Sequence, residues 1–226
     1  MKIIDAHSHI DYITHKCQKD VVGTVCNTVD EKQWSWLIKM AQEDNNIYAG
    51  FGIHPWYVES ADSECFKRLE TLLKMNRSFM VGEIGLDKYR PNMEKQIEFF
   101  IKQFEIAMGL QRTVFVHCVG AWDKILHILK QYKQSPKIVF HAFNGNDDIL
   151  KHLLQNNNMY FSFGKNALYD GFCRIEQIPI DKILIESDGK KDIILIDIIN
   201  KISQIKNNKN IDKIIYDNTR RVLSDE

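Results

Sequence analysis

Two histidines near the amino terminus have the spacing of metal ligands. His7 and His9 stand two residues apart in the segment DAHSHID, at the end of a short apolar run. Side chains two residues apart on a strand point to the same face, so both imidazoles can reach one cation. Imidazole binds zinc, manganese, iron and similar ions. The pair therefore predicts part of a metal site.

Further side chains of this chemical kind follow other apolar runs. Glu83 lies in VGEIGLD, and His117 and His141 each end an apolar run. A carboxylate has two oxygens, so Glu83 is able to bridge two cations and relieve their mutual repulsion. Glu186 and Asp188 follow the last apolar run. Asp188 is expected to bind a metal and to accept a proton from water, whose pKa a bound cation lowers, while Glu186 is expected to orient a neighbouring ligand.

One more histidine, His54, lies in GFGIHPW and is expected to hydrogen-bond an anionic substrate rather than a metal. Trp56 and Tyr57 follow it and offer aromatic faces on which a base can stack. The remaining histidines fall in a polar loop or in helical patterns and are interpreted as structural; they are His15, His127 and His152.

Eight short apolar segments are expected to be the strands that position these residues. Several lack alternation, which is typical of strands covered on both faces in a parallel sheet. The expected strands are Ile3–His7, Val21–Cys26, Ile47–Gly52, Phe79–Ile84, Thr113–His117, Ile138–His141, Met159–Phe163 and Ile183–Glu186. The expected helices are Glu31–Asp44, Asp62–Met75, Met93–Gly109, Ala121–Tyr132, Asp147–Gln155, Asp192–Ile205 and Ile211–Leu223.

This alternation predicts a single compact (β/α)8 barrel of the TIM type, one domain over residues 1–226. A doubly wound sheet is the competing fold, but it does not gather ligands from eight strand ends. About a dozen residues separate the first two strands, close to the minimum for a parallel crossover. The segment Ser8–Asp20 is therefore expected to replace the usual first helix with a loop. In such a barrel the carboxyl ends of the strands form the active-site mouth.

Composition limits the classes of function. Lys and Arg number 30 and Asp and Glu also number 30, so the formal net charge of zero excludes binding of nucleic acid through a globally basic surface. No apolar run is long enough to span a bilayer, and the amino terminus lacks the apolar core of a secretory signal. Five cysteines without CxxC spacing fit reduced thiols. We therefore expect a cytoplasmic protein with no membrane contact and no obligate protein partner.

The ordered motifs resemble the TatD-type metal-dependent hydrolases of the amidohydrolase superfamily. The matching segments are DAHSHID at 5–11, GFGIHPW at 50–56, VGEIGLD at 81–87, 96–107 in the next helix, VFVHC at 114–118, VFHAFNG at 139–145, ESD at 186–188 and DNTRRVL at 217–223. The resemblance implies two divalent cations, Mg, Mn or Zn. One would be held by His7, His9 and Asp188 and the other by His117 and His141, with Glu83 bridging them. It also implies Asp188 and Glu83 as catalytic residues, Asp188 as the base, and His54 as a substrate contact.

The resemblance further implies a phosphodiesterase, in particular a deoxyribonuclease that acts on DNA ends through water activated by two metals. Two positions depart from the family pattern: Val119 replaces a usual Arg, and Gly189 replaces a usual Pro. Because an arginine contacts phosphate in a bidentate manner, its loss favours an alternative, a metal-dependent amide or ester hydrolase for a small molecule or an aminoacyl group. A binding or scaffold protein is a third possibility, which six intact ligand positions disfavour.

Overall fold

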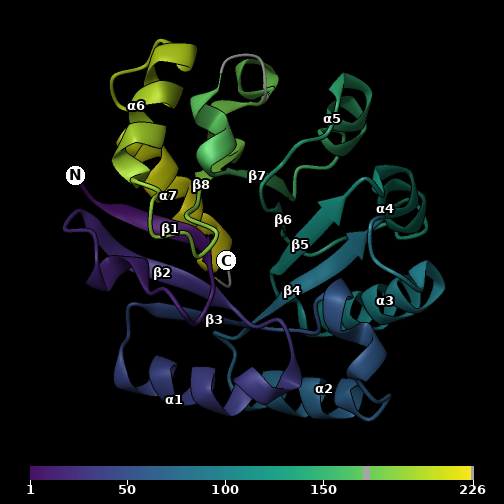
Figure 1. The fold of residues 1–226 in the computed structure, drawn as a ribbon. Helices are drawn as coiled ribbons and strands as arrows, with labels where there is room; N and C mark the ends of the chain where they lie inside the picture. Colours follow the sequence, from purple (N-terminus) through teal and green to yellow (C-terminus); the bar gives the residue numbers. More distant parts are fainter. Residues whose placement is uncertain (170–173, 225–226) are drawn as a thin grey trace.

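The eight strands lie in one parallel sheet in the order β1 to β8, and the sheet curls into a nearly closed barrel (Figure 1). A computed structural model describes residues 1–169 and 174–224. The backbone N–H of Asp188, just beyond the last strand, donates to the carbonyl of His7 on the first strand at 3.0 Å. The predicted barrel is therefore confirmed. The strands are β1 (Ile3–Ser8), β2 (Val21–Asn27), β3 (Ile47–Phe51), β4 (Met80–Asp87), β5 (Val114–Val119), β6 (Ile138–Phe140), β7 (Met159–Phe163) and β8 (Ile183–Ile185).

Helices surround the strands (Figure 1). Each segment that the sequence predicts as a helix forms one, because its apolar residues recur at helical spacing and pack against the barrel. In α3, for example, Phe100, Phe104 and Ala107 are buried. The helices are α1 (Trp34–Glu43), α2 (Cys65–Met75), α3 (Met93–Leu110), α4 (Trp122–Leu129), α5 (Asp147–Leu153), α6 (Leu195–Lys206) and α7 (Ile211–Leu223).

Two crossovers are made without an α-helix in the described residues. Between β1 and β2 there is a single 3-10 turn, η1 (Thr14–Lys16), as the short spacing of these strands predicts. Between β7 and β8 the described residues form only short 3-10 turns, namely η4 (Lys165–Leu168), η5 (Ile175–Gln177) and η6 (Ile180–Lys182).

The predicted end of the fourth strand was wrong. β4 continues to Asp87, so Glu83 lies inside the strand rather than at its end. The pairing of β4 with β5 shifts register between Val81 and Ile84, and this irregularity lets Glu83 turn into the barrel. Gly85 permits the close approach that follows: its φ is +152°, and a Cβ there would lie 1.9 Å from the carbonyl oxygen of His117.

The barrel interior below the site is filled by one apolar side chain from each strand. Buried members of this layer are Ala6, Val25, Met80, Phe115, Val139, Tyr160 and Leu184, and Tyr48 of β3 packs against them. Layers of this kind make a packed core rather than a pore, so they form a rigid floor for the residues above.

The remaining sequence expectations concern cysteines and membranes. Cys173 lies outside the described residues, and the other four cysteines are free thiols. No helix in residues 1–169 and 174–224 has the length and apolar character needed to cross a bilayer.

Candidate metal centre

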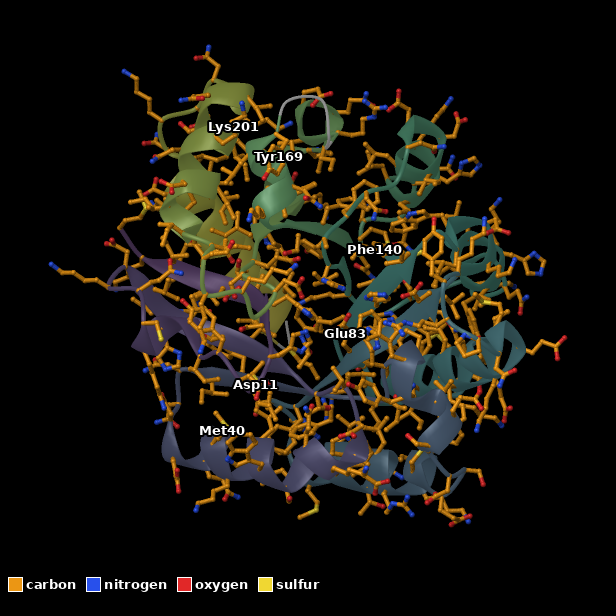
Figure 2. The ribbon with its side chains drawn as sticks, viewed as in Figure 1. Asp11, Met40, Glu83, Phe140, Tyr169 and Lys201 are labelled. Carbon is orange, nitrogen blue, oxygen red and sulfur yellow. The ribbon has the colours of Figure 1, made fainter. Side chains whose placement is uncertain are left out.

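Figure 2 shows Glu83 near the centre of the barrel. This residue is only 1% exposed, and the predicted ligands converge on it. Its side chain is surrounded by six residues from five other strands or the loops that follow them. His7 is on β1 and His117 on β5, while His9, His54, His141 and Asp188 follow β1, β3, β6 and β8. Ions, if bound, would therefore be held by parts of the chain that only the barrel brings together.

The two oxygens of Glu83 face two different groups of histidines. Oε2 lies 3.2 Å from His7 Nε2 and 3.5 Å from His9 Nε2. Oε1 lies 3.0 Å from His117 Nδ1 and 2.8 Å from His141 Nε2. This is the arrangement expected of a carboxylate that bridges two cations.

Asp188 completes the first of these groups. Its Oδ1 lies 3.8 Å from His7 Nε2 and 3.6 Å from His9 Nε2. Its Oδ2 lies 2.5 Å from the Nζ of Lys190. The side chain of Asp188 is 23% exposed, so solvent water can reach it.

Three sets of ligand atoms lie within 4.8 Å of one another: His7, His9 and Asp188; His7, Glu83 and His141; and His54, Glu83 and His117. His54, expected to contact substrate, thus falls in one of them. Its Nδ1 accepts the backbone N–H of Trp56 at 3.1 Å, so a neutral ring carries its hydrogen on Nε2. That nitrogen faces Glu83 Oε1 at 3.3 Å as a donor, which favours hydrogen bonding over metal ligation.

The rings of the other histidines are oriented for ligation. His9 Nδ1 donates to the carbonyl of Asn27 at 3.2 Å, which leaves a lone pair on Nε2. His141 Nδ1 lies 3.4 Å from Glu186, and His117 Nε2 lies 3.6 Å from Asp87. A carboxylate behind a histidine ring favours a hydrogen on the nitrogen that faces it, which leaves the other nitrogen for a ligand. The freed nitrogens of His117 and His141 lie 3.1 Å apart.

Asn27, at the end of β2, is a site residue that the sequence analysis missed. The side-chain nitrogen of Asn27 lies 2.9 Å from His7 Nδ1, and the backbone carbonyl of Asn27 accepts a hydrogen bond from His9. Asn27 therefore orients both histidines of the HxH pair. Room for this amide comes from Gly50, where a Cβ would lie 2.0 Å from Asn27 Oδ1. The only sequence signal was a polar residue at the end of an apolar strand.

Asp5 was also missed, although it lies in the same motif as His7. Its buried carboxylate accepts from the backbone N–H and the hydroxyl of Ser187, at 2.9 and 2.6 Å, and from the hydroxyl of Thr14. Burial raises the pKa of Asp5 to about 7, although these hydrogen bonds act in the opposite direction. The network joins β1 to the segment after β8 and so places Asp188.

Two buried glutamines on α3 hold the loops beside the site. Gln96 accepts from the N–H of Asp87 at 2.8 Å and donates to the carbonyl of Pro91 at 2.9 Å. Gln103 accepts from the N–H of Ile53 at 2.7 Å and donates to its carbonyl at 3.2 Å, which fixes the residue before His54. Seven residues apart, both lie on the face of α3 that meets the barrel.

Charges in the centre are strongly coupled. Burial alone would raise the pKa of Glu83, but His141, His54 and His7 lower it well below its ordinary value. Burial alone would lower the pKa of His141, but Glu83 and Glu186 raise it well above its ordinary value. Burial lowers the pKa of His54 to about 4. A cation bound at Glu83 would take over the role of the proton on His141.

A cavity of about 220 Å³ opens beside Asp188 and is lined by residues that include Phe143, Phe163, Lys165 and Lys190. Through this cavity a ligand can reach the centre from the loops that follow β6, β7 and β8. A second cavity, of about 770 Å³, lies at the opposite end of the strands near Thr113, Lys137 and Asn158 and takes no part in the site.

The donor set fits divalent cations. His7 Nε2 is buried, points at Glu83 and has no hydrogen-bond partner in the described residues, as expected of a nitrogen reserved for a metal. A parallel eight-stranded barrel with histidines and carboxylates gathered at the carboxyl ends of its strands defines the class of metal-dependent hydrolases.

Residues 4–224 match the family model described as TatD related DNase, and the chain belongs to this family. It is 26% identical over 211 residues to an uncharacterized metal-dependent hydrolase of Buchnera aphidicola, covering 84% of this chain and 78% of that protein. It is 24% identical to the human 3'-5' RNA nuclease TATDN2, covering 82% of this chain but 28% of that longer protein. The structure of YjjV, a TatD homologue from Escherichia coli, matches with a TM-score of 0.86 at 19% identity over 97% of both chains.

Proposed function

We propose that the chain hydrolyses phosphodiester bonds at DNA ends with the help of two divalent ions. The observation that carries the proposal is the arrangement at Glu83, whose Oε2 faces His7 and His9 while its Oε1 faces His117 and His141. This donor set accepts Mg, Mn or Zn. Ions held by these side chains would lower the pKa of water and would offset the charge that develops on the attacking and leaving oxygens of an in-line displacement.

Asp188 is the proposed base. Burial alone would raise its pKa, but hydrogen bonding with His9 and the charges of His141 and His7 lower it, so the carboxylate is ionised at neutral pH and able to accept a proton. Lys190 engages Oδ2, which leaves Oδ1 directed at the centre. Because the side chain is partly exposed, a proton taken from water can pass on to solvent.

His54 is the proposed substrate contact. With its Nδ1 engaged by the N–H of Trp56, it keeps a hydrogen on Nε2 within the centre. A phosphate oxygen is a suitable acceptor for that hydrogen, and the low pKa of His54 keeps the ring neutral at pH 7.

Two of the comparisons support a nuclease. The matched family is described as DNases, and the human relative is named an RNA nuclease. A second candidate, an amide or ester hydrolase, is favoured by one observation: Val119, at the end of β5, offers no cation to a phosphate.

The test is hydrolysis of an end-labelled single-stranded DNA with Mg²⁺, Mn²⁺ or Zn²⁺ supplied in turn. An RNA of the same sequence and a carboxyl ester such as p-nitrophenyl acetate complete the panel. The proposal expects shortening of the DNA from its ends, loss of that activity in EDTA, and no activity in Glu83→Gln, which controls for contaminating nucleases. DNA left intact with all three metals, together with rapid hydrolysis of the ester, would establish the second candidate instead.

A further inference from the structure

Arg90 and Trp56 form an exposed cation–aromatic pair at the rim of the metal centre. The guanidinium carbon of Arg90 lies 3.9 Å from the centroid of the Trp56 ring. Trp56 is 48% exposed, and Arg90 is exposed as well. In the part of the chain that the structure describes, Arg90 is in no ion pair, unlike Arg68 and Arg174. Its planar set of N–H donors is therefore available to an anion from outside the chain.

The pair is attached to the centre through a single carboxylate. Trp56 Nε1 donates to Asp87 Oδ2 at 2.6 Å, and the same oxygen lies 3.6 Å from His117 Nε2. The Trp56 ring lies 5.2 Å from the ring of His54 and 6.3 Å from that of His117. A group lying on this indole would therefore be adjacent to a phosphate held at the histidines.

The loop that carries Arg90 is fixed by buried contacts. The side-chain amide of Gln96 accepts from the N–H of Asp87 and donates to the carbonyl of Pro91, and it also donates to the carbonyl of Arg90 at 3.3 Å. The backbone N–H of Arg90 donates to the backbone carbonyl of Asp87 at 3.2 Å, and the backbone N–H of Tyr89 donates to Oδ1 of Asp87 at 2.9 Å. The backbone of the loop is thus fixed beside Trp56, and the side chain of Arg90 extends from it over the indole.

Local charge also favours an anionic ligand here. Lys88 is exposed in the same loop, and its side chain lies over Gly120, directly after Val119 on β5. Lys88 and Arg90 therefore place two positive charges beside the mouth of a chain whose formal net charge is zero. A local cluster of this kind binds a phosphate without a globally basic surface.

We propose that Arg90 and Trp56 bind the DNA strand next to the phosphodiester that is cut, with Arg90 contacting the neighbouring phosphate and the exposed indole contacting a base. The proposal rests on the phosphodiesterase function proposed above. Guanidinium groups bind phosphate in a bidentate manner, and single strands are held by stacking combined with such contacts. Arg90 is then a substrate-binding residue that lies outside the group of metal ligands.

The test compares Arg90→Ala with Arg77→Ala. Arg77 is exposed in the turn just before β4, whereas Arg90 follows β4, so the control removes the same charge from the other end of the same strand. Binding is measured by fluorescence anisotropy with a labelled phosphorothioate single strand in Mn²⁺. Hydrolysis of bis(p-nitrophenyl) phosphate, which has no neighbouring phosphate, reports on the metal centre itself.

Arg90→Ala is expected to weaken strand binding about tenfold and to lower the slope of log Kd against log salt by about 0.7. Arg90→Lys should recover part of the affinity, and hydrolysis of the small diester should stay unchanged in all three variants. Equal strand affinity for Arg90→Ala and Arg77→Ala, no measurable binding by the unaltered protein, or a parallel loss of small-diester hydrolysis in Arg90→Ala would each overturn the proposal. If the unaltered protein binds the strand through Arg90 but cleaves neither substrate, the proposed phosphodiesterase fails while this binding site stands.

Discussion

Replacing Gln96 with alanine tests whether one buried amide holds the loop at the rim of the centre. The side chain of Gln96 is fully buried, and its amide joins Asp87, Arg90 and Pro91 through bonds of 2.8 to 3.3 Å. The two shortest bonds contribute about 1 kcal/mol each, and leaving the N–H of Asp87 buried without a partner costs a further 1–3 kcal/mol or so. The expected loss in the free energy of unfolding is therefore about 3–5 kcal/mol.

The assay is urea unfolding followed by far-UV circular dichroism, in EDTA so that metal binding does not contribute. Lys102→Ala is the matched control, because Lys102 is exposed on the same helix. Its effect should stay within about 0.5 kcal/mol. If Gln96→Ala lost less than about 1 kcal/mol, the amide would not be a determinant of this loop, and the reasoning from its bonds would be refuted.

Three further predictions concern the ligands, their support and a surface ion pair. Glu83→Ala and Asp188→Ala should each lower turnover about 1000-fold or more with an unchanged circular dichroism spectrum; wild-type turnover in either would contradict their roles. Asn27→Ala should weaken metal affinity about 10- to 100-fold by isothermal titration calorimetry, although Asn27 is no ligand, and unchanged affinity would count against its orienting role. Burial alone would raise the pKa of Asp44, but pairing of its carboxylate with the ring of His15 at 2.9 Å lowers this pKa from 3.8 to about 2. Asp44→Asn should therefore lower the free energy of unfolding by about 1 kcal/mol at pH 7. This difference should vanish as the pH falls from about 4 to 2, because protonation of Asp44 removes the pairing. A difference in urea unfolding that persists at about pH 2 would contradict the prediction.

The barrel and the convergence of the candidate ligands were predictable because both follow from short local patterns in the sequence. Several apolar runs end in or are followed by a residue of ligand type, as at His117 and His141, and a parallel barrel brings such positions to one mouth. The register irregularity that turns Glu83 into the barrel was not predictable, because it depends on how β4 pairs with β5.

The supporting residues could not be read from the sequence for a similar reason. Asp5 and Ser187 are 182 positions apart, and Asn27 and His7 are 20 apart, so no spacing rule joins them. The hydrogen on His54 Nε2 follows from a backbone contact with Trp56, which only the turn after β3 establishes. Residue type predicted which side chains could bind a metal, whereas packing decides which of them are free to do so.

The number of metal ions bound per chain tests most directly the claim that Glu83 joins two groups of metal ligands. After equilibrium dialysis against excess Mn²⁺, elemental analysis of the protein should give about two ions per chain, and Glu83→Ala should retain about one or fewer. Saturation below one ion per chain in the unaltered protein, or an unchanged count in Glu83→Ala, would contradict a centre in which Glu83 joins two groups of histidines.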